Sequence, residues 1–525
     1  MRSWLSTPSQ SRDLTLLSVA VAGVYLASGS HPALGSSTRY VESCREMLEL
    51  GDWVVPHLGY VPYLEKPILT YWLGAISRLL FGDNNLAAQA PAALSALITV
   101  FAVYGLGHQL RDRAFGLAAG FFLLGCGLFL GMTSTLTTDM PLTACLAVAW
   151  WAWGRWDGGC RTSNLWLWVF WFALGLGFLA KGPIAIVLAG AGLGGFALLT
   201  GGWRGVFSTL WAMRPFSGLV ILALINLPWS LAVWQRDARL LEFFYIRINF
   251  QALFDGDINH AGPAWYYLPV LAGALMPFSF VTLPAWVVGV VVAMTPVWTR
   301  SALDEASRRR LYLACAALFP LLFLSVAASK LGTYILPLLP LVVITALDQI
   351  LGGFRWWSRR LLVVTAVFFL FIAVAVPVVA PVLQTAGAAG LKPELLGLTW
   401  DGLDPEDLAT VNWAWMPIFL TLALLLAVAM MAVLVALWRK RVGLALVVLG
   451  CGLTLLAMVV LPNLQHIVHD LNAARLIAVI RARGGDDSAL PAILRDPVII
   501  QQEIIHRYEL DYALRRRVEI GRAHV

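Results

Sequence analysis

The 525-residue sequence has few charged residues. They make up only 13% of the chain, against 59% hydrophobic residues, and the mean hydropathy is +0.76. Soluble domains carry roughly a quarter charged residues, so this composition excludes a soluble globular protein. A disordered chain is also excluded, because disorder needs low hydrophobicity and high net charge. We therefore expect an all-α, polytopic membrane protein.

The sequence also lacks cysteine motifs and has little lysine. Its six cysteines are scattered, with no CxxC pair and no metal-ligand spacing, so we expect no disulfide. The net charge of +7 comes mainly from arginine between apolar runs, a distribution that suggests membrane lipids and no nucleic acid as partners. The chain has five lysines: Lys66, Lys181, Lys330, Lys392 and Lys440.

Apolar runs bounded by charge, proline or glycine predict about 13 transmembrane helices. They lie near 14–29, 85–109, 114–132, 140–154, 164–180, 183–200, 217–234, 265–293, 311–328, 333–351, 361–383, 414–437 and 442–461.

Arginine clusters in every second loop, which predicts a cytoplasmic N-terminus and a multi-pass protein of the bacterial inner membrane. An odd number of spans then carries the chain after 461 to the periplasm. We expect residues 1–461 to form the membrane domain and 462–518 to begin a small periplasmic αβ domain that is cut short. Residues 519–525 read like a translated sequencing adaptor.

Two predicted outer segments are longer than simple connectors, and each contains an amphipathic stretch. Both are expected to form periplasmic interfacial helices lying along the membrane surface. In 30–83, the apolar face holds Tyr40, Val41, Cys44, Met47 and Leu48, and the polar face Glu42, Arg45, Glu46 and Glu49. In 235–262, the lipid-facing residues are Leu240, Phe243, Phe244 and Ile248, and the water-facing residues Arg239, Glu242 and Asn249.

Lys66, Lys181 and Lys330 each fall at an outer helix boundary, where basic residues should be scarce. Proline or glycine follows each one, which stops the helix and leaves the ammonium at the membrane face. Several cations at one interface can bind the phosphate of a long-chain lipid. Alternatively, each lysine only anchors a helix end by snorkelling.

Asp139 lies at the outer mouth of the fourth predicted span, and no basic residue neighbours it in the sequence. A carboxylate there is either a helix N-cap or a catalytic group, and the spacing leaves both open. Glu65 and His260 have side chains that suit a metal, although Glu65 next to Lys66 is also typical of a plain ion pair.

Several motifs, in this order, resemble the bacterial lipid A aminoarabinose transferases. These belong with the protein O-mannosyltransferases to the polyprenyl-phosphate-sugar-dependent GT-C glycosyltransferases. The resemblance covers essentially the whole membrane region. The motifs are the runs 39–47, 51–54, 63–67 and 71–73, Asp139, and the runs 180–183, 260–269 and 329–337.

This resemblance implies about 13 spans around an outward-facing cavity and a sugar donor carried on undecaprenyl phosphate. Tyr63, Lys66 and Tyr334 would contact the donor phosphate, joined by Lys181 and Lys330 from the charge argument. Lys66 and Asp139 would be catalytic. The expected enzyme is an inverting glycosyltransferase that acts on lipid A or another periplasmic acceptor.

The resemblance also implies a divalent metal such as zinc at Glu65 and His260. The chain differs from these relatives at one position that is expected to be catalytic. Relatives place an Asp-Glu pair just before Thr-Arg-Tyr, whereas this chain has Ser36 and Ser37 there. Serine cannot act as a carboxylate base, so either Asp139 serves alone, the acceptor needs no base, or this copy is impaired. The alternatives are therefore a protein O-mannosyltransferase-like enzyme and a lipid-linked-sugar binding protein without catalysis.

Overall fold

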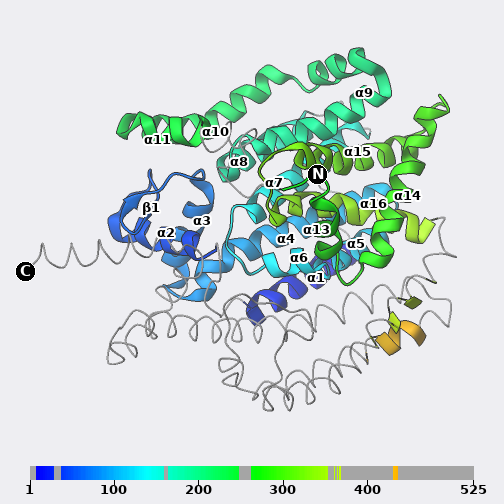
Figure 1. The fold of residues 1–525 in the computed structure, drawn as a ribbon, viewed down its shortest axis with the longest axis horizontal. Helices are drawn as coiled ribbons and strands as arrows, with labels where there is room; N and C mark the ends of the chain where they lie inside the picture. The colour runs from blue at the N-terminus through cyan, green and yellow to red at the C-terminus, as the bar shows by residue number, and fades with distance from the viewer. Residues whose placement is uncertain are drawn as a thin grey trace, which may run out of the picture.

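The computed structural model describes residues 8–28, 37–158, 164–246 and 262–352, together with short helical pieces between 360 and 435. The described chain consists of helices and one two-stranded antiparallel hairpin (Figure 1). The elements are α1 (Pro8–Ser28), α2 (Ser37–Leu50), β1 (His57–Leu58), β2 (Val61–Pro62), α3 (Leu69–Phe81), α4 (Asn85–Leu110), α5 (Arg113–Leu124), α6 (Gly127–Met132), α7 (Asp139–Asp157), α8 (Leu165–Lys181), α9 (Ile184–Ala212), α10 (Pro215–Arg236), α11 (Ala238–Glu242), α13 (Tyr267–Ala274), α14 (Ser279–Trp298), α15 (Glu305–Val326), the 3-10 helix η3 (Gly332–Leu338) and α16 (Leu339–Gly352).

Within these ranges, six helical stretches are long and apolar enough to cross a membrane. They are α4, α9, α10, α14, α15 and the continuous run of η3 and α16. The prediction of an all-α, multi-pass membrane protein is therefore confirmed. The predicted spans 361–383, 414–437 and 442–461 lie largely or wholly outside the described residues, so the total of 13 stays a prediction.

Helix breaks account for most differences from the predicted spans. The run 114–132 divides into α5 and α6, and 265–293 divides into α13 and α14. Pro277 lies in the second break, where a residue without a backbone N–H cannot continue the hydrogen-bond ladder. The helix α3 was not predicted, because at 13 residues it is too short to read as a span.

Aromatic packing fixes the centre of the bundle. Tyr312 of α15 lies between two tryptophans of α7, with ring centroids 6.1 Å from Trp150 and 4.3 Å from Trp153. Its hydroxyl donates to the backbone oxygen of Trp150 at 2.7 Å, which satisfies a buried phenol. Gly192 of α9 lets this layer close, since a Cβ there would lie 2.7 Å from the Trp150 ring. Helices α7, α9 and α15 thus pack closely around this aromatic layer.

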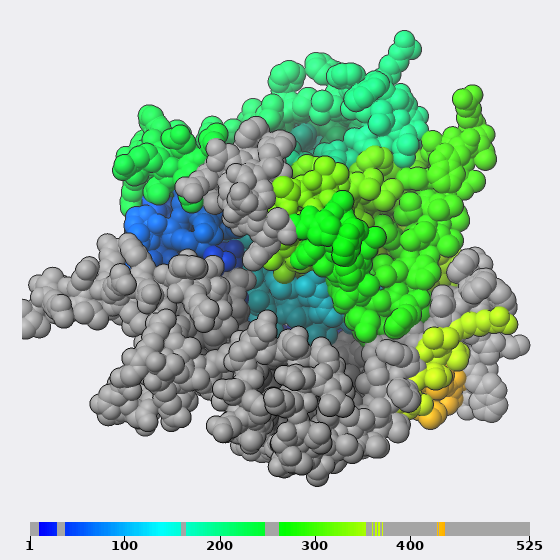
Figure 2. Space-filling view, in the orientation of Figure 1, coloured from blue at the N-terminus to red at the C-terminus, as the bar shows by residue number. Residues whose placement is uncertain are grey.

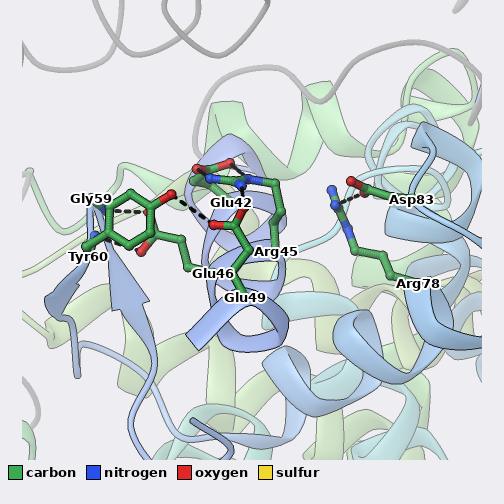
Figure 3. Close-up of polar contacts among 8 residues, drawn as sticks. All are labelled: Glu42, Arg45, Glu46, Glu49, Gly59, Tyr60, Arg78 and Asp83. Atoms are coloured by element: carbon green, nitrogen blue, oxygen red, sulfur yellow. Dashed lines mark hydrogen bonds and ion pairs between the residues drawn. The ribbon is translucent and has the colours of Figure 1, made fainter. Parts of the chain in front are cut away.

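The helix predicted in 30–83 exists as α2, but only part of its polar face is solvated: Glu49 is exposed as expected. Glu42 and Glu46 are both buried, contrary to the expectation that they face water. Glu46 accepts backbone N–H bonds from Gly59 (2.8 Å) and Tyr60 (2.9 Å) of the β1–β2 turn, and Glu42 pairs with Arg45 (Figure 3). The sequence could not show this burial because it depends on tertiary structure. The β1–β2 hairpin packs on α2, and the backbone N–H groups of its turn need a hydrogen-bond acceptor, which Glu46 provides.

The second outer segment begins with the short helix α11. Arg239 and Glu242 are exposed as predicted, whereas Phe244 is fully buried. Phe244 packs with Leu240 and Tyr40 in a cluster shared with α2, so these side chains meet protein where lipid was expected. Ile248 and Asn249 lie outside the described residues.

Candidate lipid-phosphate site

Several helix ends meet at one end of the bundle. The β2–α3 loop brings Lys66, the first residue of α7 is Asp139, and the last residue of α8 is Lys181. The 3-10 helix η3 adds Thr333 and Tyr334. We call these five residues the lysine–aspartate cluster.

Asp139 binds two other elements with its two carboxylate oxygens. Oδ1 accepts a hydrogen bond from the ammonium of Lys181, and Oδ2 accepts one from Thr333 Oγ1 at 3.2 Å. The side chains of Asp139 and Lys181 are only 8% and 9% exposed. Thr138, not Asp139, is the N-cap residue of α7, so the N-cap alternative is wrong. The carboxylate instead ties together α7, α8 and η3.

Lys181 is held by an aromatic face as well as by a carboxylate. Its ammonium lies 4.3 Å from the ring centroid of Tyr334, close enough for a cation–π interaction. Gly182 follows with φ +88°, a backbone conformation that suits glycine and stops α8 at this point. The predicted termination at Lys181-Gly182-Pro183 is therefore confirmed.

Lys66 shares the electrostatic environment of this pair. The pKa of its ammonium is lowered to about 8, mainly by burial and also by nearby Lys181 and Arg39. Glu65 and Asp139 act in the opposite direction, since each favours the charged ammonium. Lys66 is therefore mostly protonated at neutral pH, and little solvent is present to screen its positive charge.

Arg39 of α2 adds a cation to which the sequence analysis assigned no role. Its Nη1 donates to the hydroxyl of Tyr63 at 2.9 Å and lies 3.5 Å from Glu65 Oε2. Burial raises the pKa of Tyr63, so this phenol keeps its proton and can donate a hydrogen bond. The available signal was the one used for the lysines: a basic residue in a segment predicted to lie outside.

Lys330 has a different environment. It is buried, and its ammonium donates to the backbone oxygens of Ser325 (3.0 Å) and Ala327 at the end of α15. Burial lowers its pKa. These contacts satisfy carbonyls that a helix C-terminus leaves unpaired. Two of the three predicted lysines, Lys66 and Lys181, therefore lie in the cluster, while the described contacts of Lys330 hold a helix end.

Two predicted site residues, Ser36 and His260, lie outside the described residues. In the described ranges, no group of three or more histidine, cysteine, aspartate or glutamate side chains could hold a metal ion. The carboxylate of Glu65 is engaged with Arg39 instead. The described residues by themselves therefore do not form the metal site that the resemblance implied.

The chain is similar in sequence to known sugar transferases. The family of dolichyl-phosphate-mannose-protein mannosyltransferases matches residues 65–229. The undecaprenyl phosphate-alpha-4-amino-4-deoxy-L-arabinose arabinosyl transferase of Erwinia tasmaniensis is 32% identical over 313 residues, which cover 59% of this chain and 54% of the relative. Its Pseudomonas aeruginosa counterpart is 31% identical over 345 residues, covering 64% and 59%.

The fold is also similar to that of a solved structure. The crystal structure of ArnT from Cupriavidus metallidurans bound to undecaprenyl phosphate superposes with a TM-score of 0.70 at 22% identity, covering 87% of this chain and 77% of that chain. The chain therefore shares the fold of this ArnT structure. It is a multi-pass membrane protein, and it matches little more than half the length of these arabinosyl transferases.

Proposed function

We propose that this chain is a glycosyltransferase that moves a sugar from an undecaprenyl-phosphate donor to an acceptor, with lipid A as the acceptor class. The observation that supports the proposal is the partly buried lysine–aspartate cluster at one end of a membrane bundle. The relatives' names support the donor and the aminoarabinose-type transfer. The site faces the periplasm of the bacterial inner membrane in this proposal, as the arginine distribution predicts.

The cations and phenols suit a lipid phosphate better than other ligands. Lys66 and Lys181 supply two ammonium groups, and Tyr63 and Tyr334 supply phenols beside them. A phosphate has several anionic oxygens and can accept from all of these donors. In a poorly solvated site such charge-assisted bonds are stronger than in water. Lys330 enters the phosphate site only if its ammonium leaves the end of α15.

The proposed reaction transfers the sugar and develops negative charge on the departing undecaprenyl phosphate. A nucleophilic oxygen of the acceptor attacks the anomeric carbon of the sugar from the face opposite the phosphate, which inverts that centre. The bond between the anomeric carbon and the phosphate oxygen breaks, and its electron pair goes to undecaprenyl phosphate. Lys66 and Tyr334 stabilise this growing negative charge and so lower the barrier.

Asp139 is the carboxylate available for the acceptor. A hydroxyl acceptor must lose its proton, and Asp139 can orient it and accept that proton once the Lys181 contact opens. An acceptor phosphate is already anionic, so positioning alone suffices. Ser36 cannot replace a carboxylate in either case. No step is assigned to a metal at Glu65 and His260; that site stays a prediction, tested by metal analysis of the purified protein.

Two alternatives have specific support. The match to the protein mannosyltransferase family favours a protein hydroxyl as acceptor. Serine at positions 36 and 37 favours a protein that binds the lipid-linked sugar without transferring it. Both alternatives retain the phosphate site and differ only in what happens to the sugar.

The deciding experiment measures transfer. The purified chain is incubated with a labelled undecaprenyl-phosphate sugar and lipid A, and released undecaprenyl phosphate is quantified. We expect release by the native chain, loss in Lys66→Ala, and a gain when Ser36→Asp and Ser37→Glu are combined. The exposed Arg239→Gln is the matched control, because it also removes a cation.

Failure of transfer in both the native and the acidic variant, with the protein folded and the donor bound, would contradict the enzyme and favour the binding protein. Transfer to a peptide hydroxyl but not to lipid A would favour the mannosyltransferase-like alternative.

A further inference from the structure

The helix α9 changes direction near its end, and the part beyond the bend has an exposed apolar face. Gly202 has φ +59° and ψ −156°, a backbone conformation that glycine adopts readily and that interrupts the helix. We call residues 203–212 the α9 tail. Figure 1 shows α9 bending before the chain returns as α10, and in Figure 2 this teal region stands at the edge of the molecule.

The α9 tail is amphipathic. Trp203, Phe207, Leu210 and Trp211 follow the three- and four-residue spacing that places side chains on one face of a helix. All four are exposed, the two tryptophans by 72% and 71%. Their apolar surface is therefore left without protein cover in the described structure.

The tail is nevertheless fixed in place. A Cβ on Gly205 would lie 2.5 Å from the backbone oxygen of Ala197, so the tail packs back on the body of α9. At its other end, Met213 accepts a hydrogen bond from Trp171 Nε1 of α8 through its backbone oxygen, at 2.8 Å. These two contacts orient the apolar face.

The tail lies at the end of the bundle remote from the lysine–aspartate cluster. The helix α9 begins at Ile184, three residues after Lys181, and its first straight part is about 27 Å long at 1.5 Å per residue. That length crosses the hydrocarbon core of a bilayer. The apolar face then continues onto exposed Phe216 and Leu219 of α10, the next membrane span.

We propose that the α9 tail is an interfacial anchor that binds an anionic lipid surface, in the leaflet opposite the lysine–aspartate cluster. Tryptophan favours the headgroup level of a bilayer, where its ring is apolar and its N–H is solvated. Arg204 and Arg214 are exposed beside the apolar face and would meet lipid phosphates. Because two membrane spans flank the tail, it needs no further folding or partner to reach the bilayer.

Labels on the full chain in lipid nanodiscs test this proposal. In a background without the native cysteines, Phe207→Cys reports the apolar face and Ser208→Cys is its matched neighbour on the polar face. Each carries an environment-sensitive fluorophore, and the bilayer contains a lipid with a quencher near the headgroup. We expect at least about twofold stronger quenching at 207, increasing when phosphatidylglycerol replaces phosphatidylcholine. The combined Arg204→Gln and Arg214→Gln variant should lose that increase.

Equal quenching at the two positions would overturn the proposal. So would a blue-shifted emission at 207 that the lipid quencher does not change, since that result means a protein surface covers the tail. The native chain gives an independent readout if the cysteine-free background does not fold. A photoactivatable phosphatidylglycerol should label residues 203–211, and absence of label there would contradict lipid contact.

Discussion

Asp139 is the residue through which the parts of the site are connected. Its carboxylate contacts Lys181 of α8 and Thr333 of η3, and Lys181 also lies against the ring of Tyr334. A phosphate bound by Lys181 would share that ammonium with Asp139 and so weaken the contact between them. Phosphate binding would thereby free the carboxylate for the acceptor. In the proposed function, the donor and acceptor steps would thus be coupled through this ion pair.

Replacing Thr333 tests this positioning. Thr333→Val removes the hydroxyl that donates to Asp139 but keeps the shape of the side chain. A hydrogen bond to a charged group contributes about 1.5–3 kcal/mol, so we expect kcat of transfer to fall about tenfold or more with little change in KM. Thr333→Ser keeps the hydroxyl and should restore kcat. Equal kcat values for the serine and valine variants would mean that this hydroxyl does not position Asp139.

The lowered pKa of Lys66 predicts a pH dependence of donor binding. Its protonated form attracts phosphate, and with a pKa of about 8 that form is depleted as pH rises. The affinity for undecaprenyl phosphate should therefore fall roughly tenfold between pH 7 and pH 9, because the phosphate itself is already ionised above its pKa of about 6. Lys66→Arg stays charged and should flatten the profile. An affinity of the native chain that does not change over this range would exclude Lys66 as the titrating group.

At the scale of elements, close packing of α9 on the core depends on one glycine. A Cβ on Gly192 would lie 2.7 Å from the Trp150 ring and 2.8 Å from the backbone of Ala316, whereas nothing lies within 4 Å of a Cβ on Gly194. Gly192→Ala should lower the free energy of unfolding by about 1–3 kcal/mol through overpacking. Gly194→Ala, two residues further on, should leave it unchanged or raise it. Thermal unfolding in detergent measures both, and equal stabilities would contradict the close approach of α9 to α7 and α15.

The helices also show which structural features could be predicted from the sequence. Apolar runs located α4, α10 and α15 well, because length and hydropathy are local properties. The buried Glu46 could not be predicted, since its burial depends on a hairpin turn that comes 13 residues later. The α9 tail was missed for a similar reason: a helix that bends at glycine looks like a helix followed by a loop.

The site was predicted in part for comparable reasons. A basic residue in a segment predicted to lie outside is visible in the sequence, and that signal indicated Lys66 and Lys181. The partner of each cation, however, depends on which residues the folded chain brings close to it. The sequence therefore could not separate Lys181, paired with Asp139, from Lys330, whose ammonium binds the end of α15.

At the scale of the whole molecule, the end remote from the site is closed by arginine–aspartate pairs. The buried Asp348 of α16 binds Arg111 at 2.5 Å and Arg310 at 2.8 Å, while Asp13 pairs with Arg113 across α1 and α5. Pairs between different helices hold that end together.

Removing the ion pairs of Asp348 should lower the stability of the protein without changing donor binding at the candidate site. Asp348→Asn leaves two arginines without their carboxylate, and we expect a loss of about 3 kcal/mol, the lower end of the range for a broken buried pair. Donor affinity per folded molecule should not change. Asp237→Asn, which removes an exposed carboxylate paired with Arg239, is the control and should alter neither. A change of donor affinity in Asp348→Asn would show that the two ends are coupled.

The central claim is that the lysine–aspartate cluster binds a lipid phosphate, and equilibrium binding of undecaprenyl phosphate to the purified chain tests it most directly. The native chain should bind, Lys66→Ala and Tyr334→Ala should each weaken binding about tenfold, and Arg239→Gln should bind like the native chain. Equal affinities for all four proteins, with folding intact, would contradict the account.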